Sequence, residues 1–409
     1  MKITIISHNY FPEDSGIGLY STGMAEFLAL KHDVNIITGV PYYPQWKIYS
    51  NYADNPLFSK EIINNVTVYR FKQYTPAKPT FFKRVLQMTH FFLGSIFNII
   101  KVKKADVVLV VMPFTLSIIL GWFLKTIRGG GMLWVHIQDF EFDAAFKNGI
   151  SAKNQLPSKI LFKIEKWTLN RADFISTISR GMMIKSAQKT TVNQVYFPNW
   201  IDYSLINPEI AQENKVFNKN TFNILYSGNI GEKQDWNFYI EFVTAMEVHP
   251  EFHFYLVGEG AKRVEVLKQL QNKVNFTYYP PVPYKQLNNL LCDADVHVLF
   301  QKSEFNDLVM PSKILGMMAS AKPSIVTGHK DSEIKVNFEN SQGGYYFDEN
   351  TIETIKMCLM DLKNNPEKAR LMGILARDFV IENFSYEKVL SEFQLKLEDT
   401  VQKKQKNQK

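Results

Sequence analysis

The 409-residue sequence contains only two cysteines, Cys292 and Cys358, and they lie far apart. Neither belongs to a CxxC pair or to a group of His and Cys at metal-ligand spacing, so the sequence predicts no disulfide framework and no zinc site. The N-terminus lacks a charged region followed by a long apolar run and a small-residue cleavage site, which is the pattern of a secretory signal. We therefore expect a protein of the cytoplasm.

Glycine and proline are also scarce, with 20 and 17 residues, which excludes a collagenous or low-complexity chain. The length exceeds that of one ordinary domain and favours two. Residues 107–124 approach the length of a membrane span, but Pro113 and Gly121 interrupt the apolar run. We expect a buried strand over 107–112 and a buried helix from about Thr115, with a membrane span as the alternative.

Short β-branched and aromatic runs alternate with segments of helical spacing along most of the chain. Strands are predicted at residues 3–7, 34–38, 66–69, 107–112, 133–137, 174–178, 222–226, 252–257, 274–278, 296–300 and 324–326. This alternation predicts an α/β fold of two facing, doubly wound, Rossmann-like domains. Ligands of such domains bind where loops meet at the carboxyl ends of the strands, so we expect a cleft between the two domains.

Prolines and polar residues at 201–221 interrupt this alternation and mark a linker. The predicted organisation is an N-terminal, acceptor-binding domain of residues 1–200 and a C-terminal, nucleotide-sugar-binding domain of residues 222–384. A last helix over 385–401 could cross back to the first domain. The basic tail of residues 402–409 is too polar to fold alone and is expected to be disordered.

Each predicted domain opens with a strand, a glycine loop and a helix. Residues 228–233 (GNIGEK) combine glycines that admit a diphosphate, the amides of the following helix and the charge of a lysine, so they predict an anion site. The alternative is a tight turn with a solvent-facing lysine. Residues 16–18 (GIG) are a weaker signal, since no third glycine follows at dinucleotide spacing. Residues 311–313 (PSK) stand before a helix at the equivalent edge of the second sheet, with a plain helix start as the alternative.

Polar side chains near the ends of predicted strands are further candidates. His136 and Asp139 follow a buried strand and are predicted to face the cleft, with a satisfied core histidine as the alternative. Glu304 and Asp307 could accept hydrogen bonds from sugar hydroxyls or be solvated loop acids. The DxD sequence at 293–295 directly precedes a buried strand, so we assign it to capping and predict no catalytic metal.

Together these motifs resemble the GT-B glycosyltransferases of the large retaining family 4, over about residues 1–390. The segments that carry the resemblance are residues 16–18, His136, 198–202 (PNWID), 226–233 and 257–260 (VGEG). Residues 135–139, 227–234 and 308–313 are similar to a bacterial subgroup that builds O-antigen, capsule or colanic-acid-type polysaccharides, including L-fucosamine transferases. The resemblance implies a metal-independent transfer of a UDP-linked N-acetylated deoxyhexosamine, such as L-FucNAc, to a polyprenyl-diphosphate-linked saccharide. No cofactor is implied besides the nucleotide-sugar substrate.

The resemblance assigns roles residue by residue. The residues so assigned are Gly16, Gly18, Gly228, Asn229, Lys233, Pro311, Ser312 and Lys313 at the donor diphosphate, His136, Asp139 and Lys233 in catalysis, Glu304 and Asp307 at the sugar, and Val282 and Pro283 at the base.

The sequence departs from the family pattern at two places. Most members have an arginine where Asn229 stands, so Lys313 or helix dipoles must offset the missing charge. The second acid of the family's E-x7-E motif, which binds the ribose, is Gly316 here, and the first aligns near Leu308. Recognition of the ribose and of the sugar therefore depends on other groups, with the two acids just upstream as the candidates.

The net charge of +7 is unevenly distributed, because residues 62–105 contain no Asp or Glu but eight Lys or Arg. As a helix, residues 81–101 have a broad apolar face and a narrow polar stripe formed by Lys83, Arg84, Gln87, His90, Gly94, Asn98 and Lys101. This pattern predicts an interfacial helix on the anionic, cytoplasmic face of the inner membrane. The alternative is a helix that covers the first sheet. The residues predicted to contact the membrane are Lys83, Arg84, Phe91, Phe92 and Lys101.

Other functions fit the sequence less well. Nucleic-acid binding is disfavoured, since the aromatic residues of the basic segment lie on its apolar face and no RRM, KH or helix-turn-helix signature accompanies them. A GT-B-like sugar-nucleotide epimerase would need catalytic carboxylates in the cleft. A non-catalytic partner in a polysaccharide complex would bind a nucleotide without turnover. The sequence does not indicate an oligomeric state.

Overall fold

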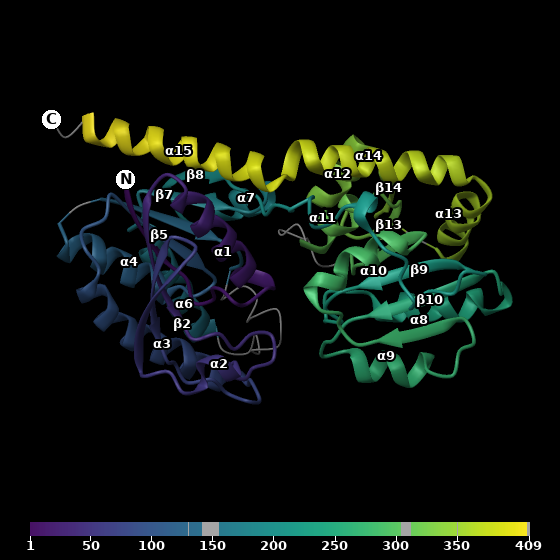
Figure 1. The fold of residues 1–409 in the computed structure, drawn as a ribbon, viewed down its shortest axis with the longest axis horizontal. Helices are drawn as coiled ribbons and strands as arrows, with labels where there is room; N and C mark the ends of the chain where they lie inside the picture. Colours follow the sequence, from purple (N-terminus) through teal and green to yellow (C-terminus); the bar gives the residue numbers. More distant parts are fainter. Residues whose placement is uncertain (130, 141–154, 304–311, 350, 407–409) are drawn as a thin grey trace. The chain divides into compact units, whose positions relative to one another are not determined.

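Runs of β-branched and aromatic residues form two mainly parallel sheets in the computed structural model, which describes residues 1–129, 131–140, 155–303, 312–349 and 351–406 (Figure 1). The chain divides into a first unit, Met1–Pro198 with Leu390–Lys409, and a second unit, Asn199–Val389. The predicted α/β fold of two Rossmann-like sheets is confirmed.

The first unit contains an eight-stranded sheet in the order β3-β4-β2-β1-β5-β6-β7-β8. Its strands are β1 (Lys2–Ile6), β2 (Asp33–Gly39), β3 (Phe58–Ile63), β4 (Val66–Phe71), β5 (Val107–Met112), β6 (Met132–Ile137), β7 (Phe174–Thr177) and β8 (Asn193–Tyr196). Its helices are α1 (Gly16–Ala29), α2 (Ser50–Ala53), α3 (Phe81–Lys101), α4 (Leu116–Ile127), α6 (Gln155–Leu169) and α7 (Arg180–Lys189). Only the pairing of β3 with β4 is antiparallel, so β1, β2, β4 and β5 to β8 end at the same edge of the sheet.

The second unit contains a six-stranded, all-parallel sheet in the order β11-β10-β9-β12-β13-β14. Its strands are β9 (Phe222–Ser227), β10 (Phe252–Val257), β11 (Phe276–Tyr279), β12 (Val296–Phe300), β13 (Ser324–Thr327) and β14 (Gly344–Phe347). Its helices are α8 (Trp236–Ala245), α9 (Arg263–Leu270), α10 (Leu287–Asp293), α11 (Ser312–Ala319), α12 (Glu333–Ser341), α13 (Ile352–Asn364) and α14 (Pro366–Phe384), with short 3-10 helices at Pro208–Ile210, Met246–Val248 and Tyr284–Gln286. The last helix, α15 (Tyr386–Lys406), begins in the second unit and ends in the first.

The predicted linker packs on the second unit through the half-buried guanidinium of Arg377. Arg377 donates from Nη1 to the carbonyl of Ile206 at 2.6 Å and from Nη2 to the carbonyl of Tyr203 at 3.3 Å. Val216 and Phe217 pack against the core of this unit. Residues 201–221 therefore belong to the second unit in spite of their polar composition.

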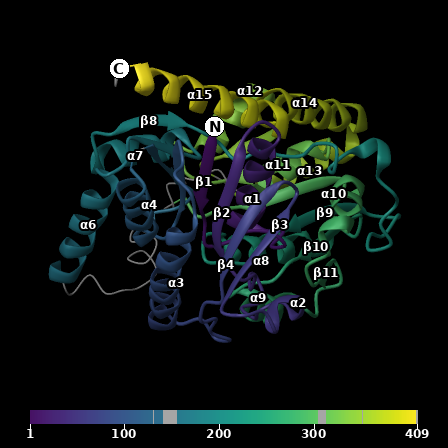
Figure 2. The ribbon, with the colours of Figure 1, turned by 60° about the vertical axis from the view of Figure 1, so that its left-hand side comes forward.

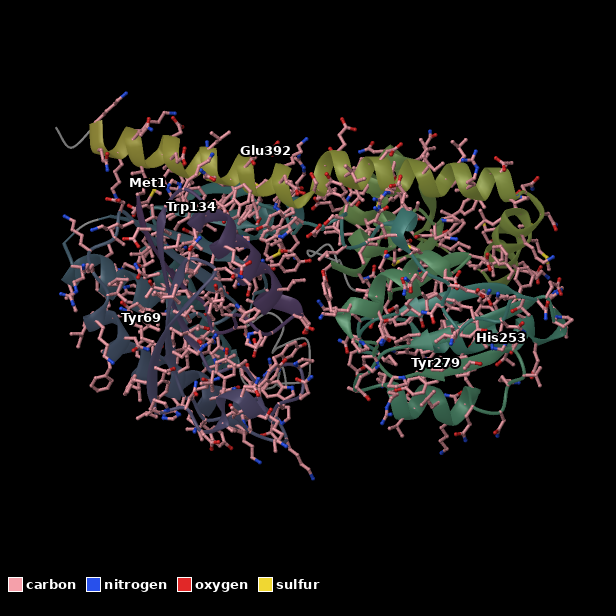
Figure 3. The ribbon with its side chains drawn as sticks, in the orientation of Figure 1. Met1, Tyr69, Trp134, His253, Tyr279 and Glu392 are labelled. Atoms are coloured by element: carbon pink, nitrogen blue, oxygen red, sulfur yellow. The ribbon has the colours of Figure 1, made fainter. Side chains whose placement is uncertain are left out.

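Helix α15 packs on the first unit through aromatic and charged contacts. The Phe393 ring stacks on Phe197 at 3.9 Å and meets Trp134 edge-on at 5.4 Å; Figure 3 shows Trp134 beneath the helix. Lys404 Nζ donates to the carbonyl of Gly131 and to Asp173, each at 3.1 Å. Residues 402–406 are helical, so the expectation of disorder there is wrong. The tertiary partners of Lys404 help to hold in place a segment that is too polar to fold alone.

Residues 107–124 form strand β5 and most of helix α4. Within the described ranges, no helix is both long and apolar enough to cross a membrane.

Helix α3 buries several small and polar side chains, whereas six of its large apolar side chains are exposed. Gln87, Gly94 and Asn98 are buried, whereas Phe82 and Phe97 are 82% and 59% exposed. Val85, Leu86, Leu93 and Ile100 are exposed as well. We call this surface the outer stripe of α3, defined as Phe82, Val85, Leu86, Leu93, Phe97 and Ile100. The predicted polar stripe is therefore partly turned inward.

Phe91 corrects the membrane prediction. It lies four residues after Gln87 and seven before Asn98, a spacing that places it on the inner face of α3. Its side chain is buried, with its ring 4.7 Å from that of His8. Phe91 is therefore unavailable to a membrane, and Phe92 is only partly exposed.

Because α3 lies close to the sheet at Gly94, a methyl group added at this position should destabilise the protein. A Cβ at Gly94 would lie 2.4 Å from the buried ring of Phe71. We expect Gly94→Ala to lower the free energy of unfolding by about 1–3 kcal/mol, because a packed core resists added volume. Urea unfolding followed by circular dichroism measures this, with Lys83→Ala on the exposed side of the same helix as the control. An unchanged unfolding midpoint for Gly94→Ala would contradict the observed packing.

Candidate functional site

The chain direction changes at the centre of the second sheet. From β9 the chain runs outward through β10 and β11, and it then returns to β12 on the other side of β9. Open parallel sheets bind ligands outside the carboxyl ends of the strands at such a reversal. The segments that follow β9 and β12 include residues 228–233 and Lys302, and the backbone amide of Lys302 donates to the Lys233 carbonyl at 3.2 Å.

The glycine loop after β9 is held by a second glycine loop after β10. Gly228 has a positive φ of 136°, and a Cβ on Gly258 would lie 1.9 Å from the Gly228 carbonyl oxygen. The Gly228 amide donates to Val257 and the Ile230 amide to Glu259, both at 2.9 Å. The two loops thus fit only with glycine at these positions, which leaves the loop after β9 fixed and open to a ligand.

Lys313 extends from the first turn of α11 over this loop. Its Nζ would lie 3.1 Å from a Cβ on Gly228, it donates to Tyr226 Oη at 2.8 Å, and it lies 4.6 Å from the centre of the tyrosine ring. Tyr226 Oη in turn donates to the Asn229 carbonyl at 2.6 Å. Burial raises the pKa of Tyr226 well above its ordinary value, so the phenol keeps its proton. Tyr226, which the sequence did not single out, therefore orients a lysine charge over the glycine loop.

Lys233 has an exposed side chain at the far end of the loop. Within the described part of the chain its Nζ has no hydrogen-bond or ion-pair partner, which leaves the charge available to a ligand. Asp235 caps helix α8 by accepting from the Phe238 amide at 3.1 Å. One of the helix amides that the sequence assigned to a phosphate is therefore taken by the chain's own carboxylate.

The other predicted donor residues have different outcomes. Ser312 is the exposed first residue of α11, and Gly316 is buried one turn after Lys313. Val282 and Pro283 follow the edge strand β11, with Val282 packed against the core. Their roles stay predictions. Glu304, Asp307, Leu308 and Pro311 lie outside the described residues.

The first sheet has the same kind of reversal, between β1 and β5. Gly16 begins helix α1 with a φ of 56°, and a Cβ on Gly18 would lie 2.7 Å from the Cβ of Glu13. Glu13 is only 2% exposed. Gly18 therefore allows the buried Glu13 to lie against the start of the helix.

Glu13 is a second residue that the sequence analysis missed. Its Oε1 accepts from the amides of Tyr42 and Tyr43 at 2.7 and 2.8 Å, and its Oε2 accepts from Asn9 Nδ2 at 2.7 Å. Burial raises the pKa of this carboxyl, while the three donors act in the opposite direction. Glu13 thereby joins the loop after β1 to the loop after β2. Its only sequence signal is an acid between a strand and a glycine turn, and many loop acids share it.

His136 lies near the end of β6 inside a hydrogen-bonded network. It is 2% exposed, with Nδ1 at 3.0 Å from Ser176 Oγ and Nε2 at 2.9 Å from Gln138 Nε2. Trp134 Nε1 also donates to Ser176 Oγ, at 2.8 Å. Burial lowers the pKa of His136 to about 3, so the ring is neutral. These contacts are those of a satisfied core histidine, and a role toward a sugar stays a prediction for His136, as it does for Asp139.

The DxD acids accept backbone amides. Asp293 Oδ2 accepts from Asn214 at 2.8 Å, and Asp295 Oδ2 accepts from Asn223 at 2.6 Å. Among the residues that the structure describes, no group of three or more His, Cys, Asp and Glu comes together as a metal site.

Two surface cavities lie away from these loops, at the amino-terminal edge of the first sheet beside α15. Their volumes are about 190 Å³ and about 500 Å³, and Lys404 lines both. Gly129 and Gly131, which precede β6, line the smaller cavity, but neither cavity is lined by the glycine loops after β9 and β10 or by the end of a strand that carries candidate groups. We give more weight to the reversal points, where polar groups and loops meet.

A family model described as glycosyl transferases group 1 matches residues 221–365, the segment that contains the glycine loop and Lys313. The chain is 33% identical over 350 residues to the putative colanic acid biosynthesis glycosyl transferase WcaI of Escherichia coli (strain K12). That alignment covers 82% of this chain and 85% of the relative.

Solved structures show the same fold at low sequence identity. Sucrose-phosphate synthase from Thermosynechococcus elongatus has a TM-score of 0.72 and 14% identity, and the match covers 98% of each chain. The Anabaena protein Alr3699/HepE in complex with UDP-glucose has a TM-score of 0.65 and 12% identity, over 98% of this chain and 100% of that one. The two units thus have the GT-B architecture.

The buried His136 predicts how stability depends on pH. Its folded pKa lies below the ordinary 6.5, so below about pH 6.5 the unfolded chain binds a proton that the folded chain does not. Stability is therefore lost as the pH falls, by about 2 kcal/mol for this residue between pH 7 and pH 5. Urea unfolding at several pH values should show a shallower decline for His136→Gln than for the parent chain. Equal slopes for the two proteins would show that the ring is not a buried neutral group.

Proposed function

Because the chain belongs to the group 1 glycosyltransferases, family 4, we propose that it transfers a sugar from a UDP-sugar to a polyprenyl-diphosphate-linked saccharide during synthesis of a bacterial surface polysaccharide. The observation that carries this proposal is the pair of lysines, Lys233 and Lys313, at the glycine loop where the second sheet reverses. UDP is supported by the complex of HepE with UDP-glucose, and a surface polysaccharide by the name of the WcaI relative. The subgroup motifs favour an N-acetylated deoxyhexosamine such as L-FucNAc as the sugar.

The proposed reaction breaks the bond between the anomeric carbon and the UDP oxygen, and an acceptor hydroxyl attacks on the same face, with retention. Negative charge accumulates on the leaving diphosphate as that bond breaks. Fixed positive groups near this oxygen stabilise the transition state more than the ground state. Lys313, held by Tyr226, and Lys233 supply such charge, and with it the role that a metal ion has in metal-dependent transferases.

Lys313 also supplies a positive charge in place of the arginine that most family members have at the position of Asn229. Its ammonium group lies against the position of a Cβ on Gly228, the residue just before Asn229. A charge delivered from α11 thus reaches the same part of the loop that an arginine side chain would reach from within it. The hydrogen bond and the ring contact with Tyr226 fix its position before substrate arrives.

Replacement of either lysine tests the proposal. We expect Lys233→Ala and Lys313→Ala each to lower turnover by at least about a hundredfold, because one lost donor of this type costs about 2.7–4 kcal/mol in the transition state. The measurement is UDP release over a panel of UDP-, GDP- and dTDP-sugars with lipid-linked GlcNAc-type acceptors. Lys268→Ala, an exposed lysine of α9, serves as the control.

Thermal unfolding shows whether the variants remain folded. Near-normal UDP release by both lysine variants would reject the proposed donor site. Interconversion of a UDP-sugar without an acceptor would favour an epimerase, and nucleotide binding without any turnover would favour an assembly partner.

Because the proposed acceptor is linked to a polyprenyl lipid, the protein should act at a membrane surface. The outer stripe of α3 supports a peripheral attachment of the protein to that surface. The buried Gln87 Nε2, Ser95 Oγ and Asn98 Nδ2 have no hydrogen-bond partner in the described part of the chain, whereas the apolar side chains of the outer stripe are exposed. Such an arrangement is unfavourable in water and favourable at the headgroup level of a bilayer. Lys83, Arg84 and Lys101 flank the stripe and complement anionic lipid.

The neighbouring helices continue this surface. Helices α3, α4 and α6 form one layer on the first sheet (Figure 2), in which α4 contacts both of the others. Arg171 lies over the rings of Trp122 and Trp167, at 5.1 and 4.6 Å. Phe123 and Trp167 are exposed. Aromatic rings beside basic groups are typical of residues at a membrane interface.

Vesicle flotation tests the attachment. We expect the parent protein to float with vesicles that contain anionic lipid at low salt, and high salt to weaken binding. The double variant Leu93→Glu and Phe97→Glu should remain in the dense fraction, because it places two acids in the outer stripe. Val264→Glu, at an exposed apolar residue of α9 in the second unit, is the matched control. The attachment is rejected if the parent stays in the dense fraction or if the double variant floats like the parent.

A further inference from the structure

His8 lies two residues after β1, where the first sheet reverses. Its ring is 8% exposed and packs edge-on against Phe91, and its Nδ1 lies 3.3 Å from Tyr42 Oη. The second ring nitrogen, Nε2, is buried and has no hydrogen-bond partner within the described residues. A buried polar atom without a partner is unfavourable, so each one in a native protein calls for an explanation.

The fold gives no reason for a second nitrogen at this place. A phenylalanine ring would pack equally well against Phe91, and the contact with Tyr42 Oη needs only Nδ1. Burial lowers the pKa of His8 to about 4, against a smaller opposing effect of the Asn9 side chain and together with Arg84, so the imidazole is neutral and its Nε2 is a short-range hydrogen-bonding group. A neutral ligand hydroxyl is therefore a better match for Nε2 than an anion.

His8 contacts an aromatic loop through Tyr42, whose ring lies 5.5 Å from its own, and this loop contacts a guanidinium. The Tyr42 ring lies 5.4 Å from Trp46, and the Tyr43 ring lies 6.4 Å from Trp46. The Arg84 guanidinium is 5.5 Å from the centre of the Trp46 ring, and the side chains of Tyr43 and Arg84 are exposed. The amides of Tyr42 and Tyr43 donate to the carboxylate of Glu13, which holds this loop in place.

The three kinds of group correspond to the three parts of one ligand. His8 Nε2 can form a hydrogen bond with a sugar hydroxyl, and the Trp46 indole offers a flat surface on which the C–H face of a sugar ring packs. A guanidinium is the side chain best suited to phosphate oxygens. Arg84 stands in the first turn of α3, between Phe82 and Leu86 of the outer stripe, so a diphosphate bound there would lie beside the surface proposed to meet lipid.

We propose that His8, Trp46 and Arg84 form the acceptor site, in which His8 Nε2 hydrogen-bonds an acceptor sugar hydroxyl, Trp46 packs on a sugar ring and Arg84 binds the lipid-linked diphosphate. This inference rests on the proposed function and names the residues that would bind its acceptor. Glu13 is a positioning residue, since it reaches the site only through the amides of the aromatic loop.

Steady-state kinetics with two soluble acceptors test the site. One acceptor is a short-chain prenyl-diphosphate saccharide, and the other is the same saccharide as a simple alkyl glycoside. We expect His8→Phe to raise the acceptor KM about threefold to tenfold with both acceptors, since one neutral hydrogen bond is lost. We expect Arg84→Gln to lower kcat/KM at least about tenfold with the diphosphate acceptor and to leave the alkyl glycoside unaffected. Lys31→Gln, an exposed lysine that follows α1, is the matched control.

Kinetic measurements on the donor substrate distinguish a failure of this inference from a failure of the proposed function. The donor KM and the slow release of UDP to water without acceptor should be unchanged in His8→Phe and Arg84→Gln. If the parent protein turns over no UDP-sugar in the panel, the proposed function fails and this inference fails with it. If the parent is active and Arg84→Gln affects both acceptors equally, or His8→Phe keeps the parent acceptor KM, the acceptor site is rejected. Should His8→Phe not fold, Trp46→Leu replaces it, and an unchanged acceptor KM for that variant has the same meaning.

Discussion

Parallel pairing on both sides of one central strand is the constraint on which the rest of this structure depends. β1 pairs with β2 and β5, and β9 pairs with β10 and β12, all in the same direction. A parallel strand can be reached only by a crossover, so the loops that follow these strands all lie at one edge of their sheet. In the first unit, such loops contain His8 and Glu13. In the second unit, they contain Gly228, Gly258 and Lys233. Within each unit, these groups share one edge of the sheet because of the position of their strands, not because they are close in the sequence.

Within these loops the chain uses uncharged partners to place charged ones. Tyr226 keeps its proton and accepts a hydrogen bond from Lys313, so a neutral phenol orients the lysine. In the first unit the buried Glu13 accepts three N–H groups and needs no cation to hold the loop after β2 in place. Lys313 in the second unit and Arg84 in the first unit place positive charge near these loops. They suit a protein whose proposed substrates both carry a diphosphate.

The sequence predicted the architecture because the signals for it are local. All eleven predicted strands are present, since β-branched runs buried on both faces are hard to mistake. The strands it missed, β3, β8 and β14, lie at sheet edges, where burial and β-branching are less regular. The glycine loop and Lys313 were found from spacing and family resemblance. His8, Glu13 and Tyr226 were not, because only tertiary packing decides whether a polar side chain is buried and whether one of its atoms lacks a partner. The orientation of α3 was missed for the same reason, since a helix with both a polar and an apolar face can place either one on a sheet.

The inward polar face of α3 has a consequence for motion within the protein. Phe91 and Ile99 are buried on this helix, but Ser95 and Asn98 between them, and Gln87 before them, add buried polar atoms that have no partner among the described residues. Buried polar atoms of this kind reduce what the helix gains from burial, so its backbone amides should exchange with solvent through local opening rather than through unfolding of the whole unit. A bilayer that covers the outer stripe would add the missing burial energy. The membrane would then act as the outermost layer of the first unit's hydrophobic core.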